Sequence, residues 1–145
     1  MAMHRTRITL APKPRGVHMV TRELLEALRD AGLPLDTVRI GSLHLLLRHT
    51  SAALFLTENA SPDVRGDLDT WLRHVVPDGW PSFAHQFEGP DDMPAHVASL
   101  LFGVDLTLPV TDGRLDLGTW QGVALGEFRD AGGARSITAT LHVND

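Results

Sequence analysis

Residues 105–117 read Asp-Leu-Thr-Leu-Pro-Val-Thr-Asp-Gly-Arg-Leu-Asp-Leu, and this stretch decides the fold class. Polar and apolar residues alternate on both sides of Asp112-Gly113, a turn pair, which predicts a strand before the turn and a strand after it. Two further alternating stretches follow, joined across residues 130–133. Connections this short leave no room for crossover helices, so these strands are expected to pair mainly antiparallel.

Upstream of this stretch, apolar residues recur at helical spacing. One helix is expected to be capped by Thr21 and closed by Gly32. A second begins at Ser61-Pro62, with serine as the cap, and a short third begins at Asp92 or Met93. Pro77 and Gly103 end these two helices. The predicted strands span residues 6–10, 17–20, 38–47, 52–56, 105–108, 114–117, 120–128 and 135–143.

The predicted order, β-β-α-β-β-α-α-β-β-β-β, is typical of the α+β class. We expect a large, mainly antiparallel sheet with helices packed on one side. The 145 residues suit a single domain spanning 1–145. The hydrophobic fraction of 43% and the charged fraction of 21% are those of an ordinary globular protein.

The composition excludes several functions. A net charge of −5 argues against a nucleic-acid surface and against binding to an anionic membrane. The absence of cysteine removes disulfides, thiolate metal sites and cysteine nucleophiles. No segment reaches the roughly 18 apolar residues of a membrane span, and no signal peptide is visible. We therefore expect a cytoplasmic protein with a small-molecule substrate.

The loop from His85 to His96 concentrates titratable groups. Its two histidines bracket three carboxylates, including Glu88, and the Gly89-Pro90 turn brings the segment back on itself. Such loops on a rigid scaffold usually carry function, although a solvated loop whose aspartates cap the next helix is the plain alternative. His96 falls in the first helical turn, where the helix dipole favours a neutral ring. Histidines with a carboxylate predict a site for zinc or another divalent ion, with acid–base catalysis as the alternative.

Other candidates stand at strand ends. His49 follows an apolar strand and precedes Thr50, while Glu58 and Asn59 end the next strand; a structural role is the alternative for each. The runs 38–47 and 52–56 form either two antiparallel strands or one strand with a sharp bend. If they pair as a hairpin, His49 and Glu58 fall near the same end of the sheet. Arg114 and Arg135 are either surface charges or the groups that grip a phosphate. Trp120 and Gln121 lead into a strand glycine, which often marks a close backbone approach.

Four motifs together resemble one family. They are His49-Thr50-Ser51-Ala52-Ala53, Glu58-Asn59-Ala60, the loop 85–96 and Gly118-Thr119-Trp120-Gln121. This combination resembles the YjbQ-like family, which is labelled a secondary thiamine-phosphate synthase family, and the resemblance runs from Thr6 to Val143. Two departures are visible, because Ser51 stands where the family has threonine and Ser136 where relatives often have a second basic residue.

The resemblance implies a homotrimer with a site near the subunit boundaries and a weak thiamine-phosphate synthase activity, which joins a pyrimidine diphosphate to a thiazole phosphate. The alternatives are a metal-dependent hydrolase of a small metabolite and a non-catalytic ligand-binding trimer. The cofactor expected is zinc or magnesium. The predicted catalytic residues are His49, Glu58, His85, Glu88, His96 and Gln121, the predicted substrate-binding residues are Thr50, Asn59, Arg114, Trp120 and Arg135, and the predicted metal ligands are His49, His85 and His96.

Overall fold

A computed structural model describes residues 1–144, and its elements follow the predicted order. The helices are α1 (Thr21–Asp30), α2 (Pro62–Val75) and α3 (Asp92–Phe102), with a 3-10 turn at Leu35–Thr37. The strands are β1 (Ala2–Leu10), β2 (Gly16–Met19), β3 (Ile40–Leu47), β4 (Ala52–Glu58), β5 (Asp105–Thr111), β6 (Arg114–Leu115), β7 (Gln121–Glu127) and β8 (Arg135–Val143).

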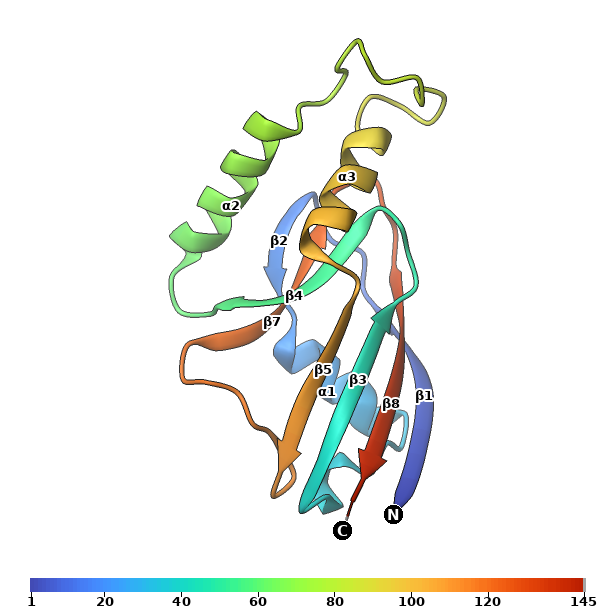
Figure 1. Cartoon of the computed structure of the whole chain (residues 1–145), viewed down its shortest axis with the longest axis vertical. Helices are drawn as coiled ribbons and strands as arrows, with labels where there is room; N and C mark the ends of the chain where they lie inside the picture. Colours follow the sequence, from blue (N-terminus) through green and yellow to red (C-terminus); the bar gives the residue numbers. More distant parts are fainter. Residues whose placement is uncertain (145) are drawn as a thin grey trace.

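The α+β class and the antiparallel pairing are confirmed, and the strands divide into two sheets. The larger sheet has the order β1-β8-β3-β5-β6, and the smaller has the order β2-β7-β4. The last strand, β8, lies between the first strand and β3, so both termini reach the same end of the molecule (Figure 1). Each sheet is therefore built from segments that are far apart in the sequence.

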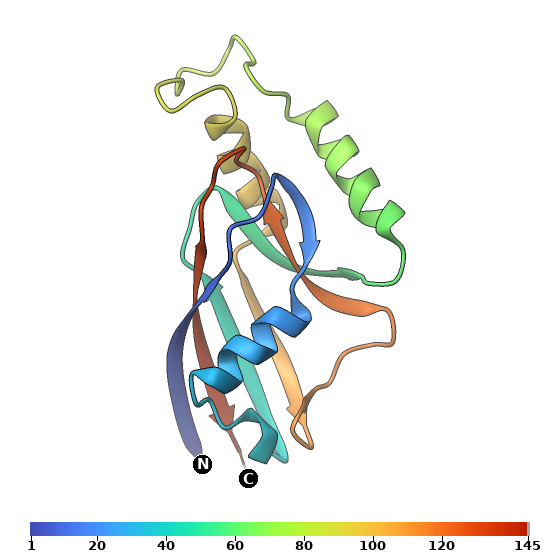
Figure 2. The same cartoon turned by 180° about the vertical axis from the view of Figure 1, so that it is seen from behind.

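The smaller sheet separates two hydrophobic cores. Alternate residues of β4 face opposite ways: Leu54 packs with the larger sheet and α1, whereas Phe55 packs with α2 and α3. Leu24 and Leu28 of α1 complete the first core, and Figure 2 shows α1 lying across the larger sheet. The period of two in a strand thus lets one short sheet serve both cores.

The chain passes from one sheet to the other at residues 48–51. Strand β3 ends at Leu47 in the larger sheet, and β4 begins at Ala52 in the smaller sheet. The hairpin interpretation is therefore wrong, because β3 pairs with β5 and β8 while β4 pairs with β7. A bent path between sheets buries both apolar runs, which a two-stranded hairpin could not do alone.

Of the two predicted caps, Thr21 takes another role and Ser61 keeps only its position. The Thr21 hydroxyl accepts a hydrogen bond from the Val123 backbone N–H at 2.9 Å, so it ties α1 to β7. Ser61 does stand at the N-cap of α2, but its side chain makes no capping hydrogen bond. Among the described residues, no helix combines the length and apolar character needed to cross a bilayer.

Candidate metal centre

Three side chains converge where the loop before α3 meets the first turn of that helix. The Asp92 Oδ2 atom lies 2.6 Å from His85 Nε2 and 3.2 Å from His96 Nε2. Asp92 and His96 are four residues apart in α3, so they share one helix face. Asp92 is 1% exposed, whereas the imidazole side chains are 47% and 29% exposed. The arrangement is a buried carboxylate with two accessible rings.

The hydrogen bonds of His96 fix which of its nitrogens carries a proton. Its Nδ1 lies 2.7 Å from the Thr50 carbonyl oxygen, which only accepts hydrogen bonds, so Nδ1 must be the donor. In a neutral ring, Nε2 then presents a lone pair to the Asp92 oxygen, and two acceptors face each other. A cation between them, either a proton or a metal ion, resolves this conflict. A backbone carbonyl on the far nitrogen is also the usual partner of a metal-binding histidine.

Potential ligand atoms of His85, Asp92 and His96 all lie within 4.8 Å of one another. Two imidazole nitrogens and one carboxylate oxygen form a donor set that suits zinc and other first-row divalent ions. Burial opposes ionisation of Asp92, but the hydrogen bond from His85 and the charge of Arg129 hold the pKa of this carboxyl below its ordinary value. The carboxylate is thus kept in the form that a metal requires.

A hollow of about 520 Å³ lies beside His96. His49 and Thr50, both predicted site residues, line it together with His96, so the bend between the sheets and α3 form one surface. The remaining wall is Ser99, Leu100, Gly103, Val104 and Asp105. A small molecule held there would contact an imidazole of the His85–Asp92–His96 cluster.

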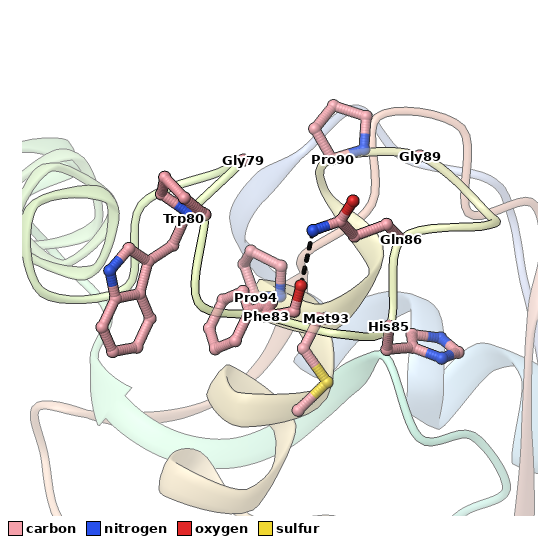
Figure 3. Close-up of a pocket in the computed structure, with 10 residues that line it drawn as sticks. Gly79, Trp80, Phe83, His85, Gln86, Gly89, Pro90, Met93 and Pro94 are labelled. Atoms are coloured by element: carbon pink, nitrogen blue, oxygen red, sulfur yellow. Dashed lines mark hydrogen bonds between the residues drawn. The ribbon is translucent and has the colours of Figure 1, made fainter.

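A second hollow, of about 500 Å³, lies in the loop before α3. Trp80 and Phe83 meet edge to face there, with ring centroids 4.9 Å apart, and Met93 lines the same hollow. Figure 3 shows that the His85 ring points away from this aromatic pair. His85 nevertheless lines this second hollow, whereas His96 lines the first together with His49 and Thr50, so the cluster borders both hollows.

His49 stands outside the cluster of ligand atoms. Its Nε2 accepts a hydrogen bond from the Ser136 backbone N–H at 2.7 Å, which ties the bend between the sheets to β8. Burial and the charges of Arg135 and Arg48 lower the pKa of His49, and the charge of Glu127 only partly opposes them. Its role as a metal ligand stays a prediction, but Nε2 is already engaged.

We expect His49 to make folding more favourable at neutral than at mildly acidic pH. A lowered pKa in the folded state means that the unfolded chain binds the extra proton, so this stability is present above the ordinary pKa of 6.5 and declines as pH falls below it. Unfolding free energies from urea denaturation between about pH 5 and 7 would measure this slope. His49→Gln keeps an acceptor for Ser136 without titrating, so it should flatten the slope; identical slopes would contradict the expectation.

Arg135 is buried next to this bend. Its Nε and Nη2 donate to the two carboxylate oxygens of Glu127 at 2.7 and 2.5 Å, and its Nη1 donates to the Ser51 hydroxyl at 3.0 Å. Glu127 is 0% exposed and Arg135 is 4% exposed. The guanidinium of Arg135 is therefore buried and already hydrogen-bonded to Glu127 and Ser51. We infer that Arg135 stabilises the bend between the sheets.

Several other predicted residues gather at the far end of the smaller sheet. Glu58 and Gln121 pair across β4 and β7 at the end that lies away from the bend. Glu58 accepts hydrogen bonds from the N–H groups of residues 60 and 61. The backbone N–H of Asn59 donates to the carbonyl oxygen of Trp120, whose side chain is exposed. These four residues therefore form a group separate from the histidine cluster.

Two predicted residues lie apart from that group as well. Arg114 pairs with Thr111 at the end of β5 that lies away from His49. Glu88 lies at the edge of the histidine cluster, with its Oε2 3.9 Å from Arg129 Nη1. Of the predicted site residues, the structure thus brings Glu88, but not Arg114, close to the cluster.

Two residues of the centre were missed by sequence reasoning. The sequence pattern places Asp92 among the carboxylates of the loop 85–96 and at the start of a helix but does not single it out as a ligand, although its spacing of four from His96 is a usable signal. Arg129, which contacts Asp92, comes from the connection between β7 and β8, and no local pattern marks it. Only the folded chain brings it to the site.

The fold and the centre together define a class: an α+β chain of two antiparallel sheets with a His/Asp cluster at the start of α3. Comparison with known families matches residues 6–144 to the family described as UPF0047 protein YjbQ-like. The chain belongs to this family. The UPF0047 protein YjbQ of Salmonella typhimurium is 53% identical over 134 residues, which cover 92% of this chain and 94% of that protein. The UPF0047 protein sll1880 of Synechocystis is 36% identical over 141 residues, covering 97% and 91%.

Solved structures give the same fold. A conserved hypothetical protein from Thermus thermophilus superimposes with a TM-score of 0.77 at 34% identity, covering 92% of this chain and 97% of that one. A protein of unknown function from Sulfolobus solfataricus P2 gives a TM-score of 0.80 at 19% identity, with 99% of both chains covered. The second likeness concerns the fold alone.

Proposed function

We propose that this chain is a divalent-metal-dependent enzyme that hydrolyses a small metabolite. The observation that carries the proposal is the pair of imidazole nitrogens facing one buried carboxylate oxygen, with the Nδ1 of His96 committed to the Thr50 carbonyl. A divalent ion held there would reconcile the two facing acceptors, as a proton on His96 also would, and the exposed histidine rings leave the position open to solvent.

The residues fit a metal ion well. His85, Asp92 and His96 would hold it, and the remaining positions would stay open to water and substrate. A divalent ion bound there would act as a Lewis acid towards water and a substrate oxygen. The Thr50 carbonyl keeps the His96 ring oriented, and the hollow beside His96 offers space for the substrate.

Thiamine-phosphate synthase activity stays a prediction with less support. Expelling pyrophosphate calls for several cationic groups around the phosphates. Arg135 is committed to Glu127, and Arg114 lies at the end of β5 away from His49. The residues lining the hollow beside His96 are mainly imidazole, hydroxyl and apolar groups, which suit hydrolysis of a less highly charged molecule better.

Metal content tests the proposal. Protein purified without a histidine tag or added metal is expected to carry close to one equivalent of zinc or a similar ion by elemental analysis. The His85→Ala, His96→Ala double variant should lose the ion, and a hydrolysis screen of metabolite pools should respond to chelator in the wild type only. A wild-type protein without stoichiometric metal, or turnover that ignores the chelator, would contradict the proposal.

A homotrimer in the cytoplasm also stays a proposal. Large apolar side chains lie exposed at several places on the chain: among them, Leu100 and Leu101 on α3 are 85% and 58% exposed, and Trp120 before β7 is 63% exposed. Isolated exposed apolar residues are common, but several on one small chain favour burial against another copy.

A further inference from the structure

Arg129 contacts three residues of the segment that leads into α3. Its Nη1 donates to Asp92 Oδ1 at 2.7 Å, its Nε donates to Asp91 Oδ2 at 2.9 Å, and its Nη2 donates to the Glu88 carbonyl at 2.9 Å. The Arg129 side chain is 22% exposed and that of Asp91 is 9% exposed, so water competes only partly for these bonds. The guanidinium therefore joins the connection after β7 to the cluster on α3.

The two oxygens of Asp92 consequently have different partners. Oδ1 accepts from Arg129, whereas Oδ2 faces the Nε2 atoms of His85 and His96. We propose that Arg129 is a positioning residue that holds Asp92 so that only Oδ2 is offered to a divalent ion beside the two histidines. This inference rests on the proposed function, because it requires the cluster to bind a metal.

The physical reason lies in the carboxylate torsion. The last torsion of an aspartate is broad, so an unrestrained side chain rotates and can offer one oxygen or both. The planar fork of arginine fixes this rotation, since it engages neighbouring acceptors in a set geometry that lysine cannot reproduce. A ligand that is already ordered loses less conformational freedom on binding, so the affinity for the metal rises.

The anchor of Arg129 is itself held in place. The Arg129 backbone N–H donates to Glu127 Oε2 at 3.2 Å, and the Asp130 backbone N–H donates to Asp91 Oδ2 at 2.9 Å. The connection after β7 therefore contacts the Asp91 carboxylate twice, through the side chain of Arg129 and through the backbone of Asp130. This double contact makes the orientation of Asp92 depend on a segment 37 residues away.

Cobalt(II) is the probe that tests the inference, because its visible absorption reports the ligands around it. Metal-free wild type, Arg129→Gln and Arg129→Lys would each be titrated with Co²⁺. We expect Arg129→Gln to weaken Co²⁺ affinity about 10–100-fold, the usual cost of losing a partner that orients a metal ligand, and to change the absorption spectrum. Arg129→Lys should recover part of the affinity, since one ammonium can reach one of the acceptors.

Arg73→Gln is the matched control. Arg73 lies on α2 and pairs only with Asp69 among the described contacts, at 3.0 Å, so its loss should leave the Co²⁺ titration unchanged. Thermal unfolding of each variant shows whether it is folded. If Arg129→Gln does not fold, the Arg129→Lys variant tests the inference instead. Lysine cannot bond all three acceptors, so its Co²⁺ affinity is still expected to be weaker than that of the wild type.

The outcomes separate the inference from the function on which it rests. Wild type that binds Co²⁺ while the folded Arg129 variants keep its affinity and spectrum would overturn the inference alone. Wild type that binds no Co²⁺ would overturn the proposed function and the inference together. A loss confined to the Arg129 variants supports both.

Discussion

Asp92→Asn is expected to lower the affinity for Zn²⁺ or Co²⁺ by more than about 100-fold and to leave a folded chain. Loss of a residue that merely orients a ligand costs about 10–100-fold, and Asp92 would supply both the oxygen and the negative charge of the centre. The amide matches the carboxylate in shape, and its oxygen can still accept the hydrogen bond that Arg129 now donates to Asp92 at 2.7 Å.

A competition titration against a chelator of known affinity would measure this loss, with circular dichroism to check the fold. Asp69→Asn is the matched control, because it removes an aspartate charge from the α2 surface, where Asp69 pairs with Arg73. Unchanged metal affinity in Asp92→Asn would show that the ion binds elsewhere or not at all.

Glu127→Ala is expected to destabilise the fold by about 3–5 kcal/mol, the usual cost of leaving one member of a buried ion pair without its partner. Arg135 would keep only its contacts with Ser51, at 3.0 and 3.3 Å, in a site that is almost closed to water. Urea denaturation would give the change in unfolding free energy.

Two further variants isolate the cause of this loss. The double variant Glu127→Leu, Arg135→Met removes both charges, so it should recover much of the stability. Glu26→Ala breaks the exposed i,i+4 pair with Arg22 and should cost less than about 1 kcal/mol. A Glu127→Ala loss as small as that of Glu26→Ala would mean that water reaches Arg135.

The order of elements could be predicted because its signals are local. Alternation around Asp112-Gly113 and the proline after Ser61 each depend on a few neighbouring residues. The division into two sheets could not be predicted, since it depends on partners such as Ile8 and Ile137 that lie far apart in the chain. Nor does the apolar character of β3 and β4 reveal that they belong to different sheets.

The candidate site likewise contains residues that local sequence patterns reveal and residues that only the folded chain brings together. His85 and His96 were predicted as partners across the Gly89-Pro90 turn, and their ring centroids lie 5.4 Å apart. Arg129 lies outside every motif, so sequence reasoning had no means of finding it. Arg135 was expected to contact a phosphate because a sequence does not distinguish a covered arginine from an exposed one, and its contact with Glu127 depends on the fold.

The position of β8 has a consequence for how the chain is made. This strand is synthesised last among the elements, yet it pairs on one side with β1 and on the other with β3. The larger sheet therefore cannot close before β8 has left the ribosome, and until then β1 and one edge of β3 stay unpaired. Exposed edges of this kind invite pairing with other chains. Folding should accordingly be slow, as contacts of long sequence separation require, and most vulnerable to aggregation just before β8 emerges.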